Sequence, residues 1–253
     1  KNAKETESFP TTVRKAVKNA VEINNMKKAH VEDGVAMLKF MRYLKERAGK
    51  EEMSEISLAD KLECFRKESK NFLDLSFDTI CGYASNGAIV HYSATPETDK
   101  KVENKGLLLV DSGAQYRYGT TDITRTFAMG KVTSEEKRAF TIVLKSHIAL
   151  ARAVFPKGTT GARLDMISRE PMYRFGMDFK HGTGHGVGYL LNVHEGPQNI
   201  SPRAFTPKFA VLPGMVTSDE PGFYEEGKFG IRHENLVLCV EKEKTEYGTF
   251  CAF

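Results

Sequence analysis

The sequence predicts an α+β domain in which helices frame a largely antiparallel sheet. Two observations predict this class. Helix signals fill the first quarter of the chain and return around residues 133–175, whereas residues 77–113 and 181–240 are rich in glycine and β-forming residues. The 253 residues, 40% of them hydrophobic, suffice to bury a core. No repeat with a period of about 20–50 residues indicates a solenoid.

Charge balance and cysteine usage restrict the class of protein. The 37 lysines and arginines stand against 33 aspartates and glutamates, and no run of like charges marks a nucleic-acid-binding arm. No apolar run approaches the roughly 18 residues of a membrane-spanning helix, and the first residues lack a signal-peptide profile. The four cysteines form no C-x-x-C pair. We therefore expect free thiols, a cytoplasmic location, and neither a nucleic-acid nor a membrane partner.

Four helices are expected. A second helix should start at Ser57, a third at the capping box of Thr133 and Glu136, and a fourth should cover about residues 160–175. The first helix is predicted over residues 20–48, where charged residues separate apolar residues that recur near the helical period: Val21, Ile23, Met26, Val31, Val35, Leu38, Met41 and Leu44.

Strands are expected between and after these helices. Residues 77–94 mix glycine, asparagine and serine with β-forming residues, which indicates short strands joined by turns. Residues 105–113 read KGLLLVDSG, a buried strand that we expect to end at Asp111. From residue 181 to about residue 240 the chain returns to strands and loops.

Residues 181–197 read HGTGHGVGYLLNVHEGP, with three histidines beside glycines at every second position. A dinucleotide-binding fingerprint is excluded, because Val187 stands where the third glycine of G-x-G-x-x-G belongs. His181 and His185 would share a helix face, but each glycine costs a helix about 1 kcal/mol. We expect an extended strand or loop in which the glycines let backbone and ligand approach closely. Taken alone, any one of these histidines is more often a structural residue than a ligand.

Acidic residues occupy segments that are otherwise expected to be buried. Asp122 follows Asp111 by eleven residues, a separation that lets two antiparallel strands bring both side chains opposite one another. Glu220 and Glu234 lie in later strand segments. Buried acids must be neutralised by protonation, by basic partners or by metal ions. Two divalent cations would balance four carboxylates, and oxygen ligands with one imidazole suit Mn²⁺, Co²⁺ or Zn²⁺.

Some of these acids have a structural alternative. Asp111 could be a turn residue before Ser112 and Gly113. Glu234 could pair with Arg232, two residues away on the same strand face, while His233 points the other way. Each alternative is credible for one residue, but together they do not account for the whole set.

Four sequence blocks, in order along the chain, resemble the motifs of a known family. They are SFDTICGYASNGAIVHY, DSGAQYRYGTTDITRTF, HGTGHGVGYLLNVHEGP and SDEPGFYEEGKFGIRHENL. They resemble the aminopeptidase P (Xaa-Pro aminopeptidase) branch of the pita-bread metallopeptidases, which also include prolidase and methionine aminopeptidase. The resemblance implies the pita-bread fold, a curved and mostly antiparallel sheet flanked by helices.

The resemblance also implies a site for two divalent metal ions, manganese in most of this branch, with cobalt or zinc as alternatives. A hydroxide bridging the ions would attack the scissile carbonyl, and Glu220 would shuttle the proton as well as bind metal. The implied metal ligands are Asp111, Asp122, His185, Glu220 and Glu234.

Further residues around the metal ions are implied by the same motifs. His194 matches a histidine near the carbonyl oxygen, where it would stabilise the oxyanion. His91 and His181 match histidines that accommodate the proline of the substrate. Arg232 matches an arginine that pairs with a metal-binding carboxylate and orients it. Tyr224 is a weaker candidate for the same position, next to the metal-binding residues.

Family members of this type are longer than this chain. We expect residues 1–19 to be an N-terminal segment or the remnant of a linker, and residues 20–253 to form the catalytic domain. Large members carry one or two domains ahead of it, which shape the pocket and contribute to dimerisation, and they continue past YGTFCAF. Upstream domains and a tail are therefore expected outside this chain, with homodimerisation as an option for the full-length protein.

The implied function is hydrolysis of the Xaa-Pro bond at the N-terminus of peptides with proline at the second position. One alternative is a prolidase-type dipeptidase, because prolidase shares the metal ligands. Another is a non-catalytic peptide-binding or histone-binding module of the same fold, which would have lost those ligands. The intact ligand set favours an enzyme, and the GTTDITRT and VHEGP motifs disfavour methionine aminopeptidase.

Overall fold

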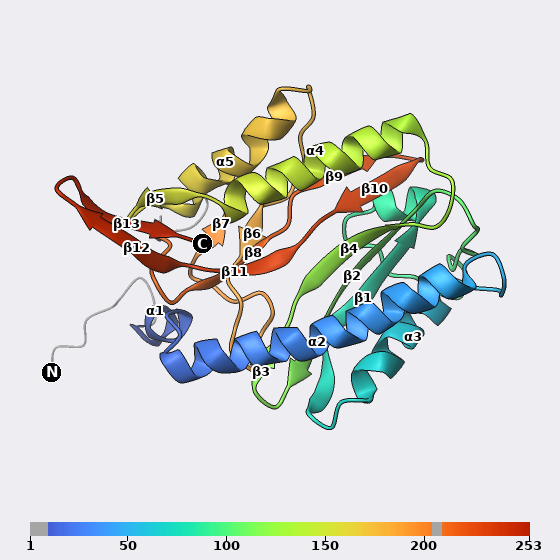
Figure 1. Ribbon diagram of the computed structural model, residues 1–253, viewed down its shortest axis with the longest axis horizontal. Coiled ribbons are helices and arrows are strands. Elements are labelled where there is room, and N and C mark those ends of the chain that lie inside the picture. Colours follow the sequence, from blue (N-terminus) through green and yellow to red (C-terminus); the bar gives the residue numbers. More distant parts are fainter. Residues whose placement is uncertain (1–9, 204–208) are drawn as a thin grey trace, which may run out of the picture.

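The computed structural model describes residues 10–203 and 209–253 (Figure 1). Its helices are α1 (Pro10–Ala16), α2 (Ala20–Arg47), α3 (Glu55–Lys67), α4 (Ser134–Ala151) and α5 (Gly161–Tyr173), with a short 3₁₀ helix η1 (Ala84–Ala88). Its strands are β1 (Phe72–Tyr83), β2 (Leu107–Tyr116), β3 (Gly119–Thr120), β4 (Ile123–Ala128), β5 (Val154–Pro156), β6 (Gly184–His185), β7 (Asn199–Ile200), β8 (Val216–Asp219), β9 (Gly222–Glu225), β10 (Phe229–Arg232), β11 (Asn235–Leu238), β12 (Val240–Thr245) and β13 (Gly248–Ala252).

The strands lie between two pairs of helices (Figure 1). Within the described residues every pairing of these strands is antiparallel, and β2 is central because it pairs with β1, β3 and β4. The pairs β8–β11, β9–β10 and β6–β7 continue the layer. Helix α3 packs on β1 and against α2, whereas α4 packs on α5 and on β8 to β10. The predicted α+β class with a mostly antiparallel sheet is confirmed.

The helix predictions hold, with one corrected start. Helix α2 covers the predicted range to within one residue. Helix α4 opens at the predicted capping box of Thr133 and Glu136. Helix α3 begins at Glu55 rather than at Ser57, because the Ser54 side chain accepts the Ser57 N–H and is the true N-cap.

Two strand predictions were wrong. The strand predicted to end at Asp111 continues to Tyr116, and Asp111 lies inside β2 between Ile80 and Thr124 of its neighbours. A turn role for Asp111 is thereby excluded. Residues 77–94 were expected to hold short strands, but their first part belongs to one long strand, β1. The register of β1 against β2 shifts three times. Bulges of this kind let one strand bend without ending.

Helix α2 turns an unexpected face to the core. Val21, Val31 and Leu38 are more than 60% exposed. The buried positions are Met26, Ala29, Asp33, Ala36, Met37, Phe40 and Leu44. The small side chains of Ala29 and Ala36 let the helix approach the sheet closely. The buried Asp33 determines which face of the helix turns inward.

Asp33 can be buried because it is fully paired. Its carboxylate accepts from Arg66 of α3 at 2.7 and 3.0 Å and from the Tyr116 hydroxyl at 2.9 Å. Arg66 also donates to the Ser112 hydroxyl on β2. A buried charge is tolerated only with such partners. The cluster therefore ties α2 and α3 to the strand that carries Asp111.

The N-terminal segment contacts the histidine-rich stretch. Lys18 is buried, and its ammonium group donates to the Val187 carbonyl at 2.5 Å. Lys15 of α1 lies 3.2 Å from the Glu195 carboxylate. The boundary after residue 19 stays a prediction, and residues 1–9 lie outside the described part.

Two sequence predictions concern the thiols and the possibility of a membrane-spanning helix. All four cysteines are free thiols, of which Cys64 is exposed. None of the described helices is both long enough and apolar enough to span a bilayer.

Candidate metal centre

One cavity of about 590 Å³ collects all nine residues to which the sequence assigned a role. They are His91, Asp111, Asp122, His181, His185, His194, Glu220, Arg232 and Glu234. Tyr224, the weaker candidate, lies behind this lining, against His181 and Arg232. The predicted convergence of carboxylates and histidines is therefore present in the structure.

The acids reach the cavity from the strand layer. Asp111 lies on β2, and Asp122 directly precedes β4. Glu220 joins β8 to β9, and Glu234 joins β10 to β11. The prediction that Asp111 and Asp122 stand opposite one another was wrong, because the register pairs Asp111 with Thr124. The two acids are nevertheless close, because burial and, after it, the charge of Asp111 raise the pKa of Asp122.

His185 is oriented as a ligand. Its Nδ1 lies 3.0 Å from the Gly186 carbonyl, so that Nδ1 carries the proton and donates it. The lone pair of Nε2 then faces the acids, 3.4 Å from both the Asp122 and the Glu220 carboxylates. Ligand atoms of Asp122, His185 and Glu234 all lie within 4.8 Å of one another. A carbonyl partner on the remote ring nitrogen is typical of metal-binding histidines.

The acids are not neutralised by protein partners alone. Burial, and after it the neighbouring acids, raise the pKa values of Asp122 and Glu234 well above their usual range. Arg232 donates at 3.1 and 2.7 Å to one oxygen of Asp111, whereas the other oxygen, Oδ1, is buried without a partner. Four carboxylates, one imidazole lone pair and an unpartnered buried oxygen fit two divalent cations.

The alternative ion pair between Arg232 and Glu234 is excluded. Arg232 binds Asp111, and one oxygen of Glu234 accepts from the Thr124 hydroxyl at 2.6 Å. His233, between them in sequence, turns away as predicted and packs edge-on against Phe140, with ring centroids 4.2 Å apart.

A chain of hydrogen bonds fixes His181. Arg232 donates to the Tyr224 hydroxyl at 2.7 Å, and that hydroxyl lies 2.8 Å from Nε2 of His181. The His181 Nδ1 lies 2.7 Å from the Gly182 carbonyl, so that Nδ1 donates and Nε2 accepts from Tyr224. Burial lowers the pKa of His181 to about 4. The ring is therefore neutral, and both of its nitrogens are engaged within the protein.

His194 and His91 are less constrained. Both are exposed and line the cavity. The His194 ring lies edge-on to His185 with centroids 4.2 Å apart. Burial, and after it the neighbouring His185, lowers the pKa of His194. This imidazole is close to the ligand group but remains available to a substrate.

Two glycines of the histidine-rich stretch allow neighbouring protein backbone to approach closely. A Cβ at Gly184 would lie 1.8 Å from the Ser218 carbonyl oxygen on β8. One at Gly186 would lie 2.1 Å from the carbonyl oxygen of Glu195. These two glycines thus make room for neighbouring protein backbone, and Gly182 and Gly184 also line the cavity.

His147 behind the ligands was missed by sequence reasoning. Its Nδ1 lies 3.0 Å from the Asp219 carbonyl and 3.2 Å from that residue's carboxylate, and its Nε2 lies 3.1 Å from the Asn235 amide nitrogen. Asp219 and Asn235 pair across β8 and β11, and each adjoins a proposed ligand. His147 therefore fixes the backbone on which two acids sit. In the sequence it is one more polar residue of a helix.

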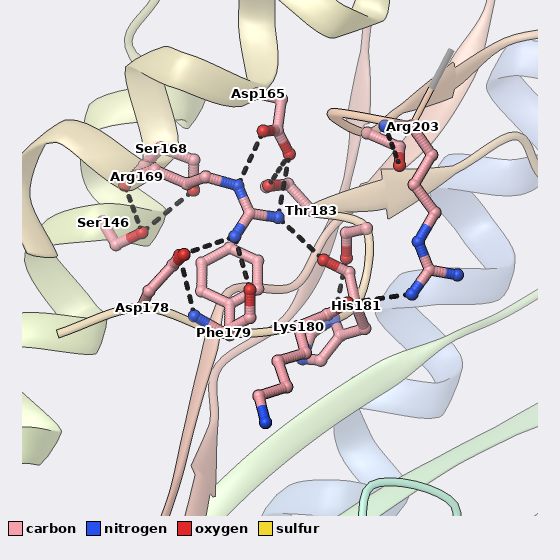
Figure 2. Close-up of polar contacts among 12 residues, drawn as sticks. Ser146, Asp165, Ser168, Arg169, Asp178, Phe179, Lys180, His181, Thr183 and Arg203 are labelled. Atoms are coloured by element: carbon pink, nitrogen blue, oxygen red, sulfur yellow. Dashed lines mark hydrogen bonds and ion pairs between the residues drawn. The ribbon is translucent and has the colours of Figure 1, made fainter. Parts of the chain in front are cut away.

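Arg169 of α5 is a second residue that sequence reasoning missed (Figure 2). Its guanidinium donates to the Phe179 carbonyl at 2.5 Å and to the His181 carbonyl at 2.7 Å. Asp165 and Asp178 hold the guanidinium itself. Arg169 thus anchors the segment from which His181 enters the cavity.

The free energy of unfolding of the metal-free protein should depend on pH through the cavity acids Asp122 and Glu234. Their pKa values are raised in the folded protein, so the folded state keeps protons that the unfolded chain releases above about pH 4. The free energy of unfolding of chelator-treated protein should therefore contain a contribution that falls as pH rises. Glu234→Gln should reduce that fall, because one acid of the cluster no longer ionises.

Urea unfolding of both metal-free proteins between about pH 5 and pH 7 measures the difference. The histidines are common to both proteins, so their contribution cancels in the comparison. An equal pH dependence for the two proteins would contradict the crowding of the acids.

Comparison with known proteins places this geometry in a family. A sequence model of metallopeptidase family M24 matches residues 24–241. The chain is 46% identical over 235 residues to a "Probable Xaa-Pro aminopeptidase P" of Sordaria macrospora, covering 92% of this chain and 38% of the relative. A protein of the same name from Aspergillus fumigatus is 48% identical over 238 residues, covering 93% and 36%. The chain spans about two fifths of the length of such relatives.

Solved structures agree with this placement. The X-prolyl aminopeptidase of Caenorhabditis elegans, described as a cytosolic enzyme with a di-nuclear active site, superposes with a TM-score of 0.91 at 38% identity, covering 97% of this chain and 40% of that one. Prolidase from Pyrococcus furiosus superposes with a TM-score of 0.79 at 30% identity, covering 94% and 65%. The pita-bread fold implied by the sequence motifs is confirmed. The chain belongs to metallopeptidase family M24.

Proposed function

We propose that this domain is the catalytic part of an Xaa-Pro aminopeptidase, which removes the first residue of peptides that have proline at the second position. One observation carries the proposal. Four acids and the free lone pair of His185 converge in a cavity that His181 and His194 also line. Such a set suits metal-assisted hydrolysis of an amide. The relatives named above support the choice of amide.

Asp111, Asp122, His185, Glu220 and Glu234 would hold two divalent cations. We propose manganese, as in the branch that the motifs resemble, with cobalt or zinc also suited to the donor set. When bound, the cations would polarise the scissile carbonyl and lower the pKa of a water molecule.

Glu220 is the residue proposed to move the proton. Its carboxylate is held by the Ser218 hydroxyl at 3.0 Å and lies next to His185. The departing nitrogen belongs to proline, and it must gain a proton to leave as an amine. A carboxylate fixed at the centre of the cavity can accept the proton of the attacking water and deliver it to that nitrogen.

The histidines would divide between the carbonyl and the proline ring. His194, neutral and unconstrained at the cavity surface, would donate to the developing oxyanion. His181 has both nitrogens engaged and would present its ring to proline, with His91 nearby. Arg232 would keep Asp111 and Tyr224 in place.

Proline at the second position should be strongly preferred. Its nitrogen carries no hydrogen and its φ is fixed, so a site shaped for it lacks contacts for an ordinary amide. Replacing proline by alanine in an Ala-Pro-Ala peptide should cost much of kcat/KM, measured by release of the first residue. Equal turnover of Ala-Ala-Ala and Ala-Pro-Ala would contradict the proposed substrate class.

The dipeptide Ala-Pro, added to this assay as a third substrate, distinguishes the alternative functions. A prolidase-type enzyme would cleave Ala-Pro and leave Ala-Pro-Ala intact, whereas a peptide-binding or histone-binding module would cleave neither. For the full-length protein we propose a cytoplasmic location, which agrees with the four free thiols. Homodimerisation and a contribution of upstream domains to the pocket stay predictions.

A further inference from the structure

Two basic residues line the cavity without a role in the chemistry described above. They are Lys180, which precedes His181, and Arg203. Both are exposed, and neither forms an ion pair with a carboxylate of residues 10–203 or 209–253. The acids that would be neutralised by metal line the same cavity. Within the described residues no acid neutralises these cations, so they can meet an anionic group that arrives with the substrate.

The backbone beneath Lys180 is held in place. Three successive carbonyl groups each accept from a guanidinium: Phe179 from Arg169 at 2.5 Å, Lys180 from Arg203 at 3.2 Å, and His181 from Arg169 at 2.7 Å. Figure 2 shows this arrangement, with the Lys180 ammonium group extending away from it. Because this backbone is already fixed, only the side chain must be ordered when Lys180 binds a ligand.

The position of this pair relates it to one end of the substrate. Under the proposed function, on which this inference rests, His181 contacts the proline ring. Lys180 directly precedes His181 in the same segment, and the Arg203 guanidinium donates to the Lys180 carbonyl. The pair therefore adjoins the proposed proline site, which would hold the leaving-group part of the substrate.

We propose that Lys180 and Arg203 bind a carboxylate on the leaving-group side of the scissile bond. It would come either from the C-terminus of a short peptide or from an aspartate or glutamate that follows proline. Lysine and arginine both recognise carboxylates, and neither needs a buried position to do so. The domain would thus prefer short or acidic Xaa-Pro substrates over neutral ones.

Four substrates test the proposal: Ala-Pro-Ala with a free C-terminus, Ala-Pro-Ala amide, Ala-Pro-Asp amide and Ala-Pro-Asn amide. Exposed charge pairs contribute modestly, so each of the two carboxylate substrates should have a KM about two- to fivefold below its neutral counterpart. The difference should shrink as salt is raised, because salt screens exposed charges. The kcat should be nearly the same within each pair.

Lys180→Gln and Arg203→Gln should each reduce the difference in KM, and the double variant should remove it. Turnover of the two neutral amides should stay at the wild-type value. Lys28→Gln, at an exposed lysine on α2, is the matched control and should leave every value unchanged. If the preference is seen only for the free C-terminus, or only for aspartate, that result identifies the source of the carboxylate.

Two results would overturn the proposal separately from the proposed function. Wild-type protein that cleaves all four peptides with equal KM has no carboxylate preference, although it remains an Xaa-Pro aminopeptidase. A preference that survives in the double variant must come from other residues. Wild-type protein that cleaves none of the four, with metal supplied, overturns the proposed function and this inference together.

Discussion

His185→Ala is expected to remove both the bound metal and the peptidase activity. The residue offers the only imidazole lone pair among the proposed ligands, at 3.4 Å from both Asp122 and Glu220. Alanine leaves the acids facing each other without that donor. Metal affinity should fall by more than about 100-fold, because losing a group that merely orients a ligand already costs roughly 10–100-fold.

The measurement is metal content by elemental analysis after dialysis, alongside kcat/KM on Ala-Pro-Ala. Manganese should also cease to raise the melting temperature of the variant, because a ligand stabilises only the state that binds it. Circular dichroism establishes that the variant is folded. His185→Ala protein that keeps its full metal content would remove His185 from the ligand set.

Much of this centre could be predicted because its signals are local in sequence. Acids in apolar strand segments, such as Asp111 after four apolar residues, stand out without any knowledge of the fold. The start of α4 was predictable for the same reason, since its capping residues lie within one turn of the positions they cap. The range of α2 was predictable from the spacing of its apolar residues.

Other features depend on contacts between distant segments. Asp33 is an ordinary helix acid until Arg66 and Tyr116 approach it, and its burial then rotates α2 so that Val31 and Leu38 face outward. Arg169 similarly acquires a role only where the fold brings the carbonyls of residues 179 and 181 to it. Long-range polar partners leave no periodic signal in the sequence.

The register between strands is a second feature that the sequence alone does not predict. Spacing alone predicted that Asp111 and Asp122 would face each other, but the turn through β3 uses residues that shift the pairing to Thr124. The two acids still share one cavity, because Asp122 directly precedes its strand. A register is set by turn geometry as well as by residue pattern, and the turn was not readable here.

His194→Ala should lower kcat sharply while leaving metal content unchanged. The His194 ring lies beside His185, with centroids 4.2 Å apart, but it is exposed and its neutral imidazole can donate to a substrate. Removing one donor from an oxyanion site costs about 10²–10³ in kcat. Because the donor acts mainly on charge that develops during the reaction, KM should change far less than kcat.

The pair His185→Ala and His194→Ala therefore separates two roles that adjacent rings could share. Elemental analysis after dialysis is run on both variants, and steady-state kinetics on Ala-Pro-Ala are run with manganese in excess so that weakened binding cannot mimic a catalytic loss. His194→Gln, which keeps an amide N–H donor, should recover part of the lost kcat. If His194→Ala loses metal as fully as His185→Ala does, His194 binds a cation directly and the carbonyl oxygen must be stabilised by another group.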